Sequence, residues 1–344
     1  MTPFLVPIFL LCLISSLATA ANFNLVYQWN ELDYEWPSEA SRTQAIENGT
    51  YKPQNIKVRF MAVFGTRIFL SLHFSNGIPV TLVSLSTSSA SSASPKLTPF
   101  PSWDMHGYGD CDKIEEATGL EVDSSGMLWV LDEGSTNTNC TAKLWIFNNN
   151  HTELIHRFSF RFYVNDLVLD ETRNGTRAYI SRRRQRHIVV FSLDRNQSWM
   201  VETPGIEVLS IALSPKSKEE PKQLYLSKWN SNELYSISVD ALRKGTPTAN
   251  PKLIGKWTAT DSYRMLMDNH GTLHAAFWGK NYINSWNTSQ PFEEQRFHEV
   301  TVRILYWPFT FGLDQSETLW MTVFDAESVQ KLRLFKAAVD DSPK

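Results

Sequence analysis

Two adjacent carboxylates, Asp132 and Glu133, stand before Gly134 at the end of the stretch LEVDSSGMLWVLDEG. Such acids could do acid–base chemistry, or they could mark the end of a structural unit. The choice depends on whether the surrounding pattern recurs, because an acid that recurs at equivalent positions is explained by the fold more easily than by catalysis.

An aspartate followed six residues later by an aromatic or histidine position does recur. The clearest copies read LEVDSSGMLWVLD, LMDNHGTLHAAF and GLDQSETLWMTVF. The aligned pairs are Asp123 with Trp129, Asp268 with His274, and Asp314 with Trp320. A looser copy contains Asp170. Because Asp favours the first position of a type I turn, we interpret these acids as turn residues and not as a catalytic set.

The repeats indicate an all-β protein. Each copy contains a hydrophobic strand, a polar turn and a second strand, which is the pattern of a hairpin, and a third short strand follows most copies. The hairpins begin near residues 58, 120, 167, 211, 265 and 311. A step of about 50 residues with several strands in each unit predicts a six-bladed β-propeller, formed as a single domain by residues 21–344.

The segment from Leu25 to Trp36 is strand-like and precedes the first blade. We expect it to pair with the last blade and close the ring, because free edge strands promote aggregation. In this architecture Asp132 and Glu133 fall at the end of a blade's second strand, where acids usually take part in turns. The Ser/Ala-rich stretch at 87–95 is interpreted as a flexible linker between two blades.

His270 and His274 have the spacing of two zinc ligands on a helix. In the repeat alignment they lie on either side of Gly271 in a hairpin, and His274 takes the position that is Trp in other copies. We therefore predict no metal site and no cofactor. A calcium site of the kind found in lactonase-type propellers is an alternative, with Glu121 and Asn165 as oxygen ligands.

Residues 1–20 have the features of a secretory signal peptide. The run from Phe4 to Ala18 is almost entirely apolar and leads into the small-residue pattern Ala18-Thr19-Ala20. The run is short for a membrane anchor, which needs about 20 apolar residues. We predict a secreted, extracellular protein that begins near Ala21.

Cysteines and sequons agree with secretion. Cys12 lies in the signal peptide, and Cys111 and Cys140 remain as a pair that we predict to form a disulfide in an oxidising compartment. Six Asn-x-Ser/Thr sequons predict N-glycosylation of exposed loops. Their asparagines are Asn48, Asn139, Asn150, Asn174, Asn196 and Asn287.

The net charge of −3 is spread along the chain and predicts neither a nucleic acid nor an anionic membrane as partner. We expect a monomer. A short basic run between two strands contains Arg182, Arg183, Arg184 and Arg186. Such a run is usually a solvated loop, and alternatively it could bind an anionic partner such as a sulfated glycan.

Several longer motifs resemble the Yellow and major royal jelly protein family of secreted insect proteins, over nearly the whole mature chain from Trp29 to Leu334. They include NGTYKPQNI, GIPVTL, LTPFPSW and VDSSGMLWVLDEG in the first half, and GIEVLSIALSP, NELYSISVDAL and LMDNHGTL in the second. The resemblance implies a six-bladed propeller, which agrees with the count of repeats.

Members of that family serve in cuticle pigmentation, as candidate dopachrome-converting enzymes, as food storage proteins and as salivary binders of biogenic amines. The amine binders hold their ligand in the central channel, and by position the resemblance implies that Thr310, Thr322 and Phe324 face it. Amine-binding relatives have an asparagine where Val323 stands, and the valine side chain cannot form hydrogen bonds.

We therefore expect a protein that binds a small aromatic amine or catechol in the channel. A propeller channel is concave and preformed, and an ammonium group gains from an aromatic ring face. The alternatives are dopachrome conversion, a role in cuticle pigmentation, or a structural or storage role without a specific ligand. No catalytic residue is assigned, because the sequence has no Ser-His-Asp order, nucleophile elbow or metal-ligand cluster.

Overall fold

The computed structural model describes residues 22–88, 94–134, 139–148, 152–160, 163–215, 221–301, 309–325 and 331–338. The signal peptide predicted at 1–20, most of the linker predicted at 87–95 and the sequon asparagine Asn150 lie outside the described residues.

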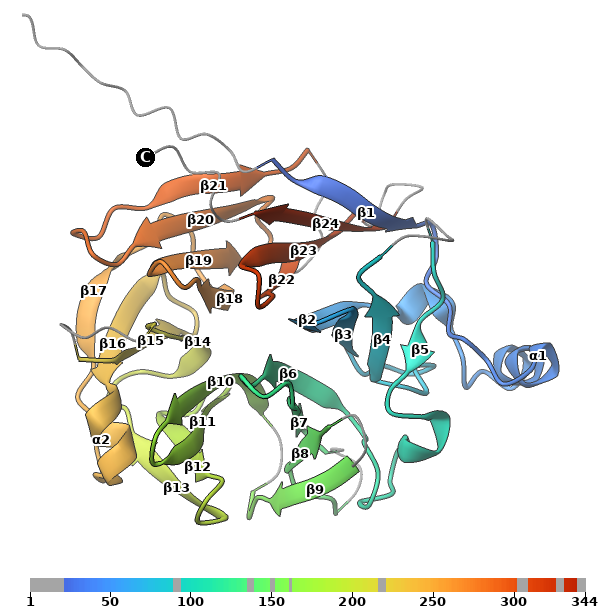
Figure 1. Cartoon of the computed structure of the whole chain (residues 1–344), viewed down its shortest axis with the longest axis horizontal. Coiled ribbons are helices and arrows are strands. Elements are labelled where there is room, and N and C mark those ends of the chain that lie inside the picture. Colours follow the sequence, from blue (N-terminus) through green and yellow to red (C-terminus); the bar gives the residue numbers. More distant parts are fainter. Residues whose placement is uncertain are drawn as a thin grey trace, which may run out of the picture.

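Six four-stranded antiparallel sheets surround a central axis, as Figure 1 shows, and this confirms the predicted six-bladed β-propeller. The strands of each blade are given from the innermost to the outermost. Blade 1 contains β2 (Val58–Phe64), β3 (Arg67–Leu72), β4 (Leu82–Ser86) and β5 (Thr98–Pro99). Blade 2 contains β6 (Ala117–Val122), β7 (Leu128–Asp132), β8 (Lys143–Phe147) and β9 (Thr152–Arg157). Blade 3 is β10 (Val164–Thr172), β11 (Gly175–Arg182), β12 (His187–Ser192) and β13 (Gln197–Glu202), and blade 4 is β14 (Val208–Leu213), β15 (Gln223–Lys228), β16 (Glu233–Ser238) and β17 (Lys252–Lys256). Blade 5 is β18 (Ser262–Met267), β19 (Thr272–Phe277), β20 (Tyr282–Asn287) and β21 (Gln295–Glu299).

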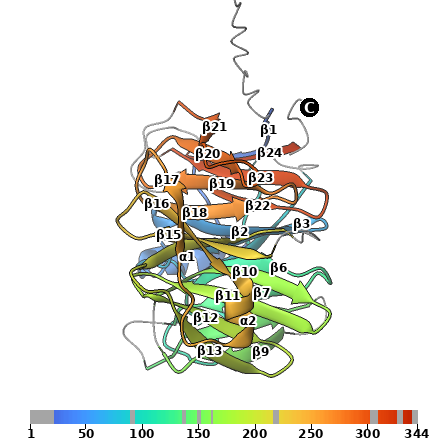
Figure 2. The same cartoon turned by 90° about the vertical axis from the view of Figure 1, so that its left-hand side faces the viewer.

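Blade 6 is assembled from both ends of the described chain. It contains β22 (Phe309–Leu313), β23 (Thr318–Phe324) and β24 (Leu332–Ala338), and its outermost strand is β1 (Asn24–Trp29). Strand β1 pairs antiparallel with β24, and Figures 1 and 2 both show the two side by side. The predicted closure by an N-terminal strand is confirmed, and it removes the free edge of the last blade.

The recurring aspartates have the structural role that the repeats indicate. The Asp123 carboxylate accepts a hydrogen bond from the indole N–H of Trp129 at 2.9 Å, and Asp314 accepts one from Trp320 at 2.8 Å. In blade 5 the His274 ring takes the place of the indole, 3.1 Å from Asp268. Since each aspartate also accepts backbone N–H groups of its own turn, it fixes the turn and the second strand together.

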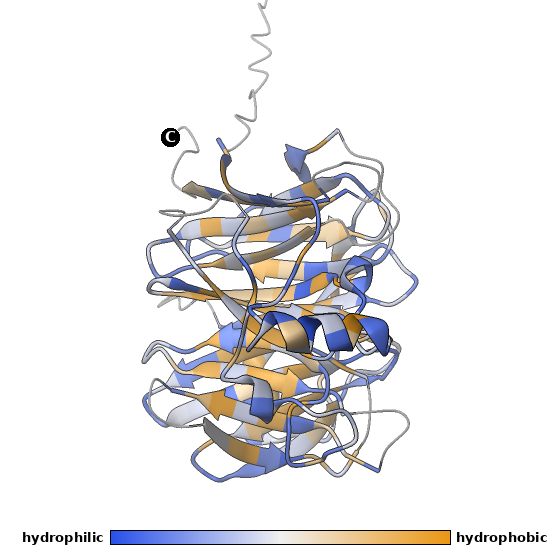
Figure 3. Cartoon of the chain, turned by 90° about the vertical axis from the view of Figure 1, so that its right-hand side faces the viewer, coloured by the Kyte–Doolittle hydropathy of each residue, from blue (hydrophilic) through white to orange (hydrophobic). Residues whose placement is uncertain are grey.

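Hydrophobic side chains fill the spaces between neighbouring sheets. Figure 3 shows that hydrophobic residues are concentrated in the strands and hydrophilic residues in the connections. The outermost strands are largely exposed, as in β13, β17 and β21, so their sequences carry little alternation and the repeat pattern does not reveal them.

Two short α-helices were also not predicted. Helix α1 (Glu39–Glu47) begins at a capping box between Ser38 and Ser41, and α2 (Val239–Lys244) ends at Gly245 in the left-handed conformation. Short 3₁₀ turns lie at η1 (Pro53–Asn55) and η2 (Trp103–Met105). Within the described part of the chain, every helix is too short or too polar to span a membrane.

Candidate functional site

One mouth of the central channel forms a cavity of about 290 Å³. It lies where the innermost strands of blades 1, 3, 4 and 5 begin, because the first residues of β2, β10, β14 and β18 line it. Its aromatic lining residues are Phe60, Trp229, Tyr263 and Trp278. Its other lining residues are Arg59, His73, Asn165, Arg183, Leu209, Asn230, Asp261 and Arg264. An aromatic wall with a few convergent polar groups is the usual form of a small-molecule site.

The aromatic wall has a buried part and an open part. The rings of Tyr263 and Trp278 meet edge to face, with centroids 6.4 Å apart. The Tyr263 hydroxyl donates to the backbone oxygen of Phe309 at 2.7 Å, and burial raises its pKa, so this hydroxyl stays protonated and fixed. Trp278 is 46% exposed, and the guanidinium carbon of Arg184 lies 4.6 Å from the ring of Trp229. A ligand can therefore reach a preformed ring surface from the solvent.

Asp261 is the one carboxylate among the described residues that line this cavity. It precedes β18, with a backbone φ of 54°, and accepts a hydrogen bond from the backbone N–H of Asn230 at 2.6 Å. Burial raises its pKa, and no cationic side chain of the described residues counteracts that rise. A desolvated carboxylate without a cationic partner is suited to bind a cationic group of a ligand.

Two arginines that line the cavity share one glutamate. Arg59 lies 3.3 Å from Glu116 and 3.6 Å from Glu133, and it donates to the side-chain oxygen of Asn165 at 3.1 Å. Arg183 lies 3.4 Å from the other oxygen of Glu133. Burial, together with the charge of Glu133, raises the pKa of Glu116 to about 7. The two guanidinium groups and the two glutamates therefore form one buried charge network beside the cavity.

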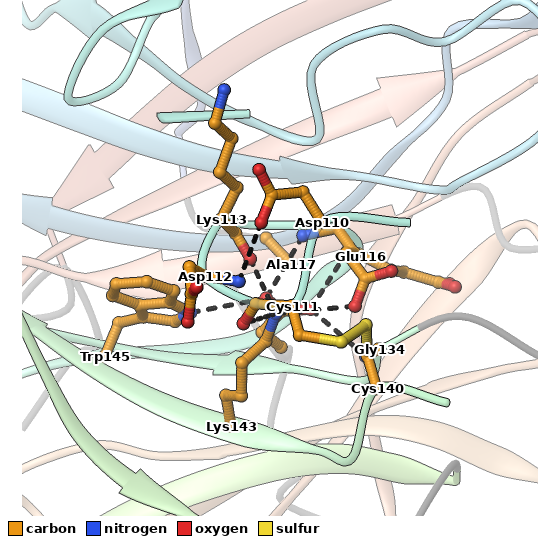
Figure 4. Close-up of polar contacts among 12 residues, drawn as sticks. Asp110, Cys111, Asp112, Lys113, Glu116, Ala117, Gly134, Cys140, Lys143 and Trp145 are labelled. Carbon is orange, nitrogen blue, oxygen red and sulfur yellow. Dashed lines mark hydrogen bonds and ion pairs between the residues drawn. A yellow bond between two sulfur atoms is a disulfide. The ribbon is translucent and has the colours of Figure 1, made fainter. Parts of the chain in front are cut away.

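The adjacent acids Asp132 and Glu133 thus have different partners. Asp132 accepts backbone N–H groups at 3.0–3.1 Å and pairs at 3.1 Å with the fully buried Lys143. Lys143 also donates to the backbone oxygen of Cys111, beside the predicted Cys111–Cys140 disulfide, which is confirmed (Figure 4). Asp132 therefore anchors the disulfide-bonded loop, whereas Glu133 does more than end a strand, because it holds Arg59 and Arg183, two of the three arginines that line the cavity.

Arg264 separates this cavity from a second one at the opposite mouth of the channel. Its side chain lines both and donates to Asp166 at 2.8 Å and to the backbone oxygen of Phe311 at 3.3 Å. The second cavity, about 450 Å³, contains Glu121, whose pKa is raised to about 7 by burial. Glu121 and Asn165 line different cavities, and the described ranges contain no group of three or more His, Cys, Asp or Glu residues that could hold a metal ion.

The three residues predicted to face the ligand lie in blade 6. Thr310 on β22 and Thr322 on β23 are register partners, and both are buried. Phe324 lines a third cavity, of about 200 Å³, which also contains Trp29 of the closing strand. None of the three is among the described residues that line either channel cavity. Their contact with a ligand stays a prediction.

The basic run does not form one outward-facing surface. The guanidinium carbon of Arg182 lies 3.9 Å from the ring of Phe160 and is buried, and Arg183 turns to Glu133. Arg186 is exposed and lies 3.3 Å from Glu207. A glycan contact through Arg182, Arg183, Arg184 and Arg186 stays a prediction. The sequon asparagines within the described ranges are all exposed, namely Asn48, Asn139, Asn174, Asn196 and Asn287.

Sequence reasoning missed Asp261, Trp229 and Trp278 as cavity residues. They belong to connections between strands, where no residue type recurs from one repeat to the next. A signal did exist for Tyr263 and Arg264, because they stand at the start of the fifth repeat, as Arg59 and Phe60 stand at the start of the first. Residues at the start of an innermost strand point to one mouth of the channel.

The solved structures to which this chain is similar share its fold. A calcium-binding protein, regucalcin, from Agrobacterium tumefaciens superposes with a TM-score of 0.53 at 14% identity, over 83% of this chain and 92% of that one. A luciferin-regenerating enzyme superposes with a TM-score of 0.53 at 12% identity, over 87% of this chain and 95% of that one. At such identities the similarity establishes the propeller fold alone.

Sequence comparison is more specific. Protein yellow of Drosophila melanogaster is 25% identical over 342 residues, and so is Protein yellow of Drosophila simulans; each alignment covers 86% of this chain and 63% of the relative. The chain thus spans less than two thirds of the length of these relatives. The profile of the family described as major royal jelly protein matches residues 116–207 and 205–323, more than half of the chain. This protein therefore belongs to the Yellow and major royal jelly protein family.

Proposed function

We propose that the protein is secreted and binds a small aromatic amine, such as a catecholamine, in the cavity lined by Asp261. The observation that carries the proposal is this carboxylate, which is desolvated, has no cationic partner among the described residues and lies in a cavity walled by aromatic rings. Secretion is supported by the disulfide and by the exposed sequons.

The chemistry of an aromatic amine matches this wall. An ammonium group loses bound water when it enters the cavity. A charge-assisted hydrogen bond to the Asp261 carboxylate replaces that water. The exposed ring of Trp278 attracts the same cation, and the ligand's own ring gains from leaving water. The wall is preformed, since Tyr263 is fixed by its hydrogen bond to Phe309, so little ordering accompanies binding.

Calorimetric titration of the purified glycoprotein with dopamine, octopamine, serotonin and histamine tests the proposal. We expect one-to-one binding of at least one amine with a Kd of about 1 μM or below, which corresponds to about −8 kcal/mol. Flat titrations with all four would contradict amine binding and leave catechol conversion or a structural or storage role.

Two variants locate the site. Asp261→Asn removes the proposed counter-ion, whereas Thr322→Val removes the hydroxyl that the family resemblance points to. Loss of affinity in Asp261→Asn with retention in Thr322→Val supports the cavity at the mouth of the channel. The reverse result would place the amine in blade 6.

Conversion of an oxidised catechol is the second candidate. His73 lines the same cavity, and burial, followed by the charges of Arg59 and Arg183, lowers its pKa to about 4. A neutral imidazole can accept a proton from a bound ligand, but a base this weak contributes little near neutral pH, so binding is the better supported function. Turnover of dopachrome that is lost in His73→Gln would favour the enzyme.

A further inference from the structure

The charged residues of the cavity come from two opposite sides of the propeller. Arg59 begins blade 1 and Arg183 follows the second strand of blade 3, and both reach Glu133 of blade 2. Asp261 lies between blades 4 and 5 and is bonded to Asn230. In a ring of six, blade 2 stands opposite blade 5, as Figure 1 shows for β6 and β18. The guanidinium groups that contact Glu133 and the carboxylate of Asp261 therefore come from different sides of the channel mouth. The third lining guanidinium, that of Arg264 on blade 5, is paired with Asp166.

The arginine side has a spare hydrogen-bond donor. Arg59 and Arg183 share Glu133, and Arg59 also contacts Glu116. The buried Nε atom of Arg183 has no hydrogen-bond partner among the described residues. The positive charges of Arg59 and Arg183 also act on the nearby His73, where they add to burial in lowering its pKa.

Aromatic side chains line the cavity beside both groups of charges. Phe60 and Tyr263 belong to the innermost strands of blades 1 and 5, and Trp229 lies in a connection of blade 4. A ligand that satisfies the whole cavity therefore has a cation at one end, an aromatic ring in the middle and an oxyanion at the other end. A guanidinium binds a carboxylate or sulfate through two parallel N–H groups more strongly than it binds a neutral hydroxyl.

We propose that the cavity recognises a bipolar aromatic ligand, with an ammonium group at Asp261 and a carboxylate or sulfate on the far end of the ring at Arg183. This inference rests on the proposed amine site and names its ligand class. It makes Arg183 the residue that distinguishes an acidic ring substituent from a neutral one.

A series of three probes that differ only at the far end of the ring tests this. Phenethylamine has no polar group there, tyramine has a hydroxyl, and 4-(2-aminoethyl)benzoic acid has a carboxylate. We expect the Kd to fall along the series, with the carboxylate probe binding about 10-fold more tightly than tyramine. Equal or weaker binding of the carboxylate probe would overturn the bipolar site and leave the amine site intact. Flat titrations with all three would overturn both.

Two glutamine variants from the same basic run assign the effect to a residue. In Arg183→Gln the ratio of the tyramine and carboxylate-probe Kd values falls from about 10 towards 1. Arg186→Gln is the matched control, because Arg186 pairs with Glu207 outside this cavity, and it keeps the wild-type ratio. An unchanged ratio in Arg183→Gln would overturn the assignment.

A third measurement separates the two ends. 4-Ethylbenzoic acid has the carboxylate and lacks the amine. If this probe binds to the wild-type protein and binds less tightly to Arg183→Gln, the cavity recognises the carboxylate independently of the amine. Failure of this probe to bind, together with flat titrations of the carboxylate-bearing amine, would contradict the oxyanion end.

Discussion

Asp166 of blade 3 and Arg264 of blade 5 form an ion pair of 2.8 Å that spans the position of blade 4 within the channel. Both side chains are almost completely buried. Arg264 is also the residue that both channel cavities share. Arg264 therefore lies between the two cavities, and a ligand in the cavity of Asp261 meets a floor made by this guanidinium group and the ring of Phe60, 5.0 Å from it.

Replacement of Arg264 by Met is expected to lower the free energy of unfolding by about 3–5 kcal/mol, because it leaves the buried Asp166 carboxylate without a cation. Urea unfolding followed by tryptophan fluorescence measures this. The matched control is Arg186→Met, which breaks the exposed pair with Glu207 and should cost less than about 1 kcal/mol. Similar losses in both variants would argue against a special role for the buried pair.

Replacement of Asp261 by Asn is expected to weaken amine binding about 10- to 100-fold, since a hydrogen bond to a charged group contributes about 1.5–3 kcal/mol. The fold should be retained, because the Asn side chain keeps an oxygen for the Asn230 N–H. Calorimetry of the variant provides the affinity, and its unfolding midpoint provides the check on folding.

The same carboxylate makes binding dependent on pH. Burial raises the pKa of Asp261 above its usual value of 3.8, so protonation at falling pH removes the charge that the ammonium needs. Amine affinity should fall as the pH is lowered through this raised pKa, and Asp261→Asn should abolish that fall. A wild-type affinity that increases on acidification would be inconsistent with Asp261 as the counter-ion.

The propeller was predictable from the sequence because the residues that form each blade recur at regular spacing along the chain. The pairs Asp123–Trp129 and Asp314–Trp320 recur at one spacing, and each fixes the same turn against the same strand. The role of Asp261 was not predictable in the same way. It lies in a connection, and only the fold of blades 4 and 5 places it beside Asn230 and in one cavity with Arg183.

Glu133 has a position that the repeat predicts and contacts that the repeat does not predict. Its position at the end of a blade's second strand follows from the repeat, and turn chemistry was the reasonable interpretation. Its contacts with Arg59 and Arg183 join three blades, and a pattern within one repeat contains no information about such contacts. The blade-6 residues Thr310 and Thr322 are register partners, and their relation to a ligand depends on geometry that the sequence alone does not supply.

Removal of the disulfide by the double change Cys111→Ser and Cys140→Ser is expected to lower the free energy of unfolding by about 3–4 kcal/mol, because the closed loop has a sequence separation of 29 residues. The Lys143 network beside it should then open more readily, since Lys143 donates to the backbone oxygen of Cys111. Chemical unfolding of the variant gives the loss, and a change below about 1 kcal/mol would contradict it.

Glu121 should make the stability of the whole propeller depend on pH. Its pKa is about 7 in the folded protein, raised from 4.5 by burial, so the folded state holds a proton that the unfolded state has already released. The stabilisation is complete below the unfolded value and is lost as the pH rises through about 7. Wild-type protein should therefore lose stability between about pH 5 and pH 8 relative to Glu121→Gln, which cannot ionise.

The control for this prediction is Glu121→Asp, which keeps a titratable carboxyl group in the second cavity and should keep a decline of the same sign. Unfolding free energies of the three proteins, measured at both pH values in the same buffer, decide the point. Parallel pH profiles for wild type and Glu121→Gln would show that Glu121 is ionised in the folded protein near neutral pH. The carboxylate would then have to be stabilised by Arg264, whose positive charge acts on it, and the floor of the channel would hold three interacting charges and not two.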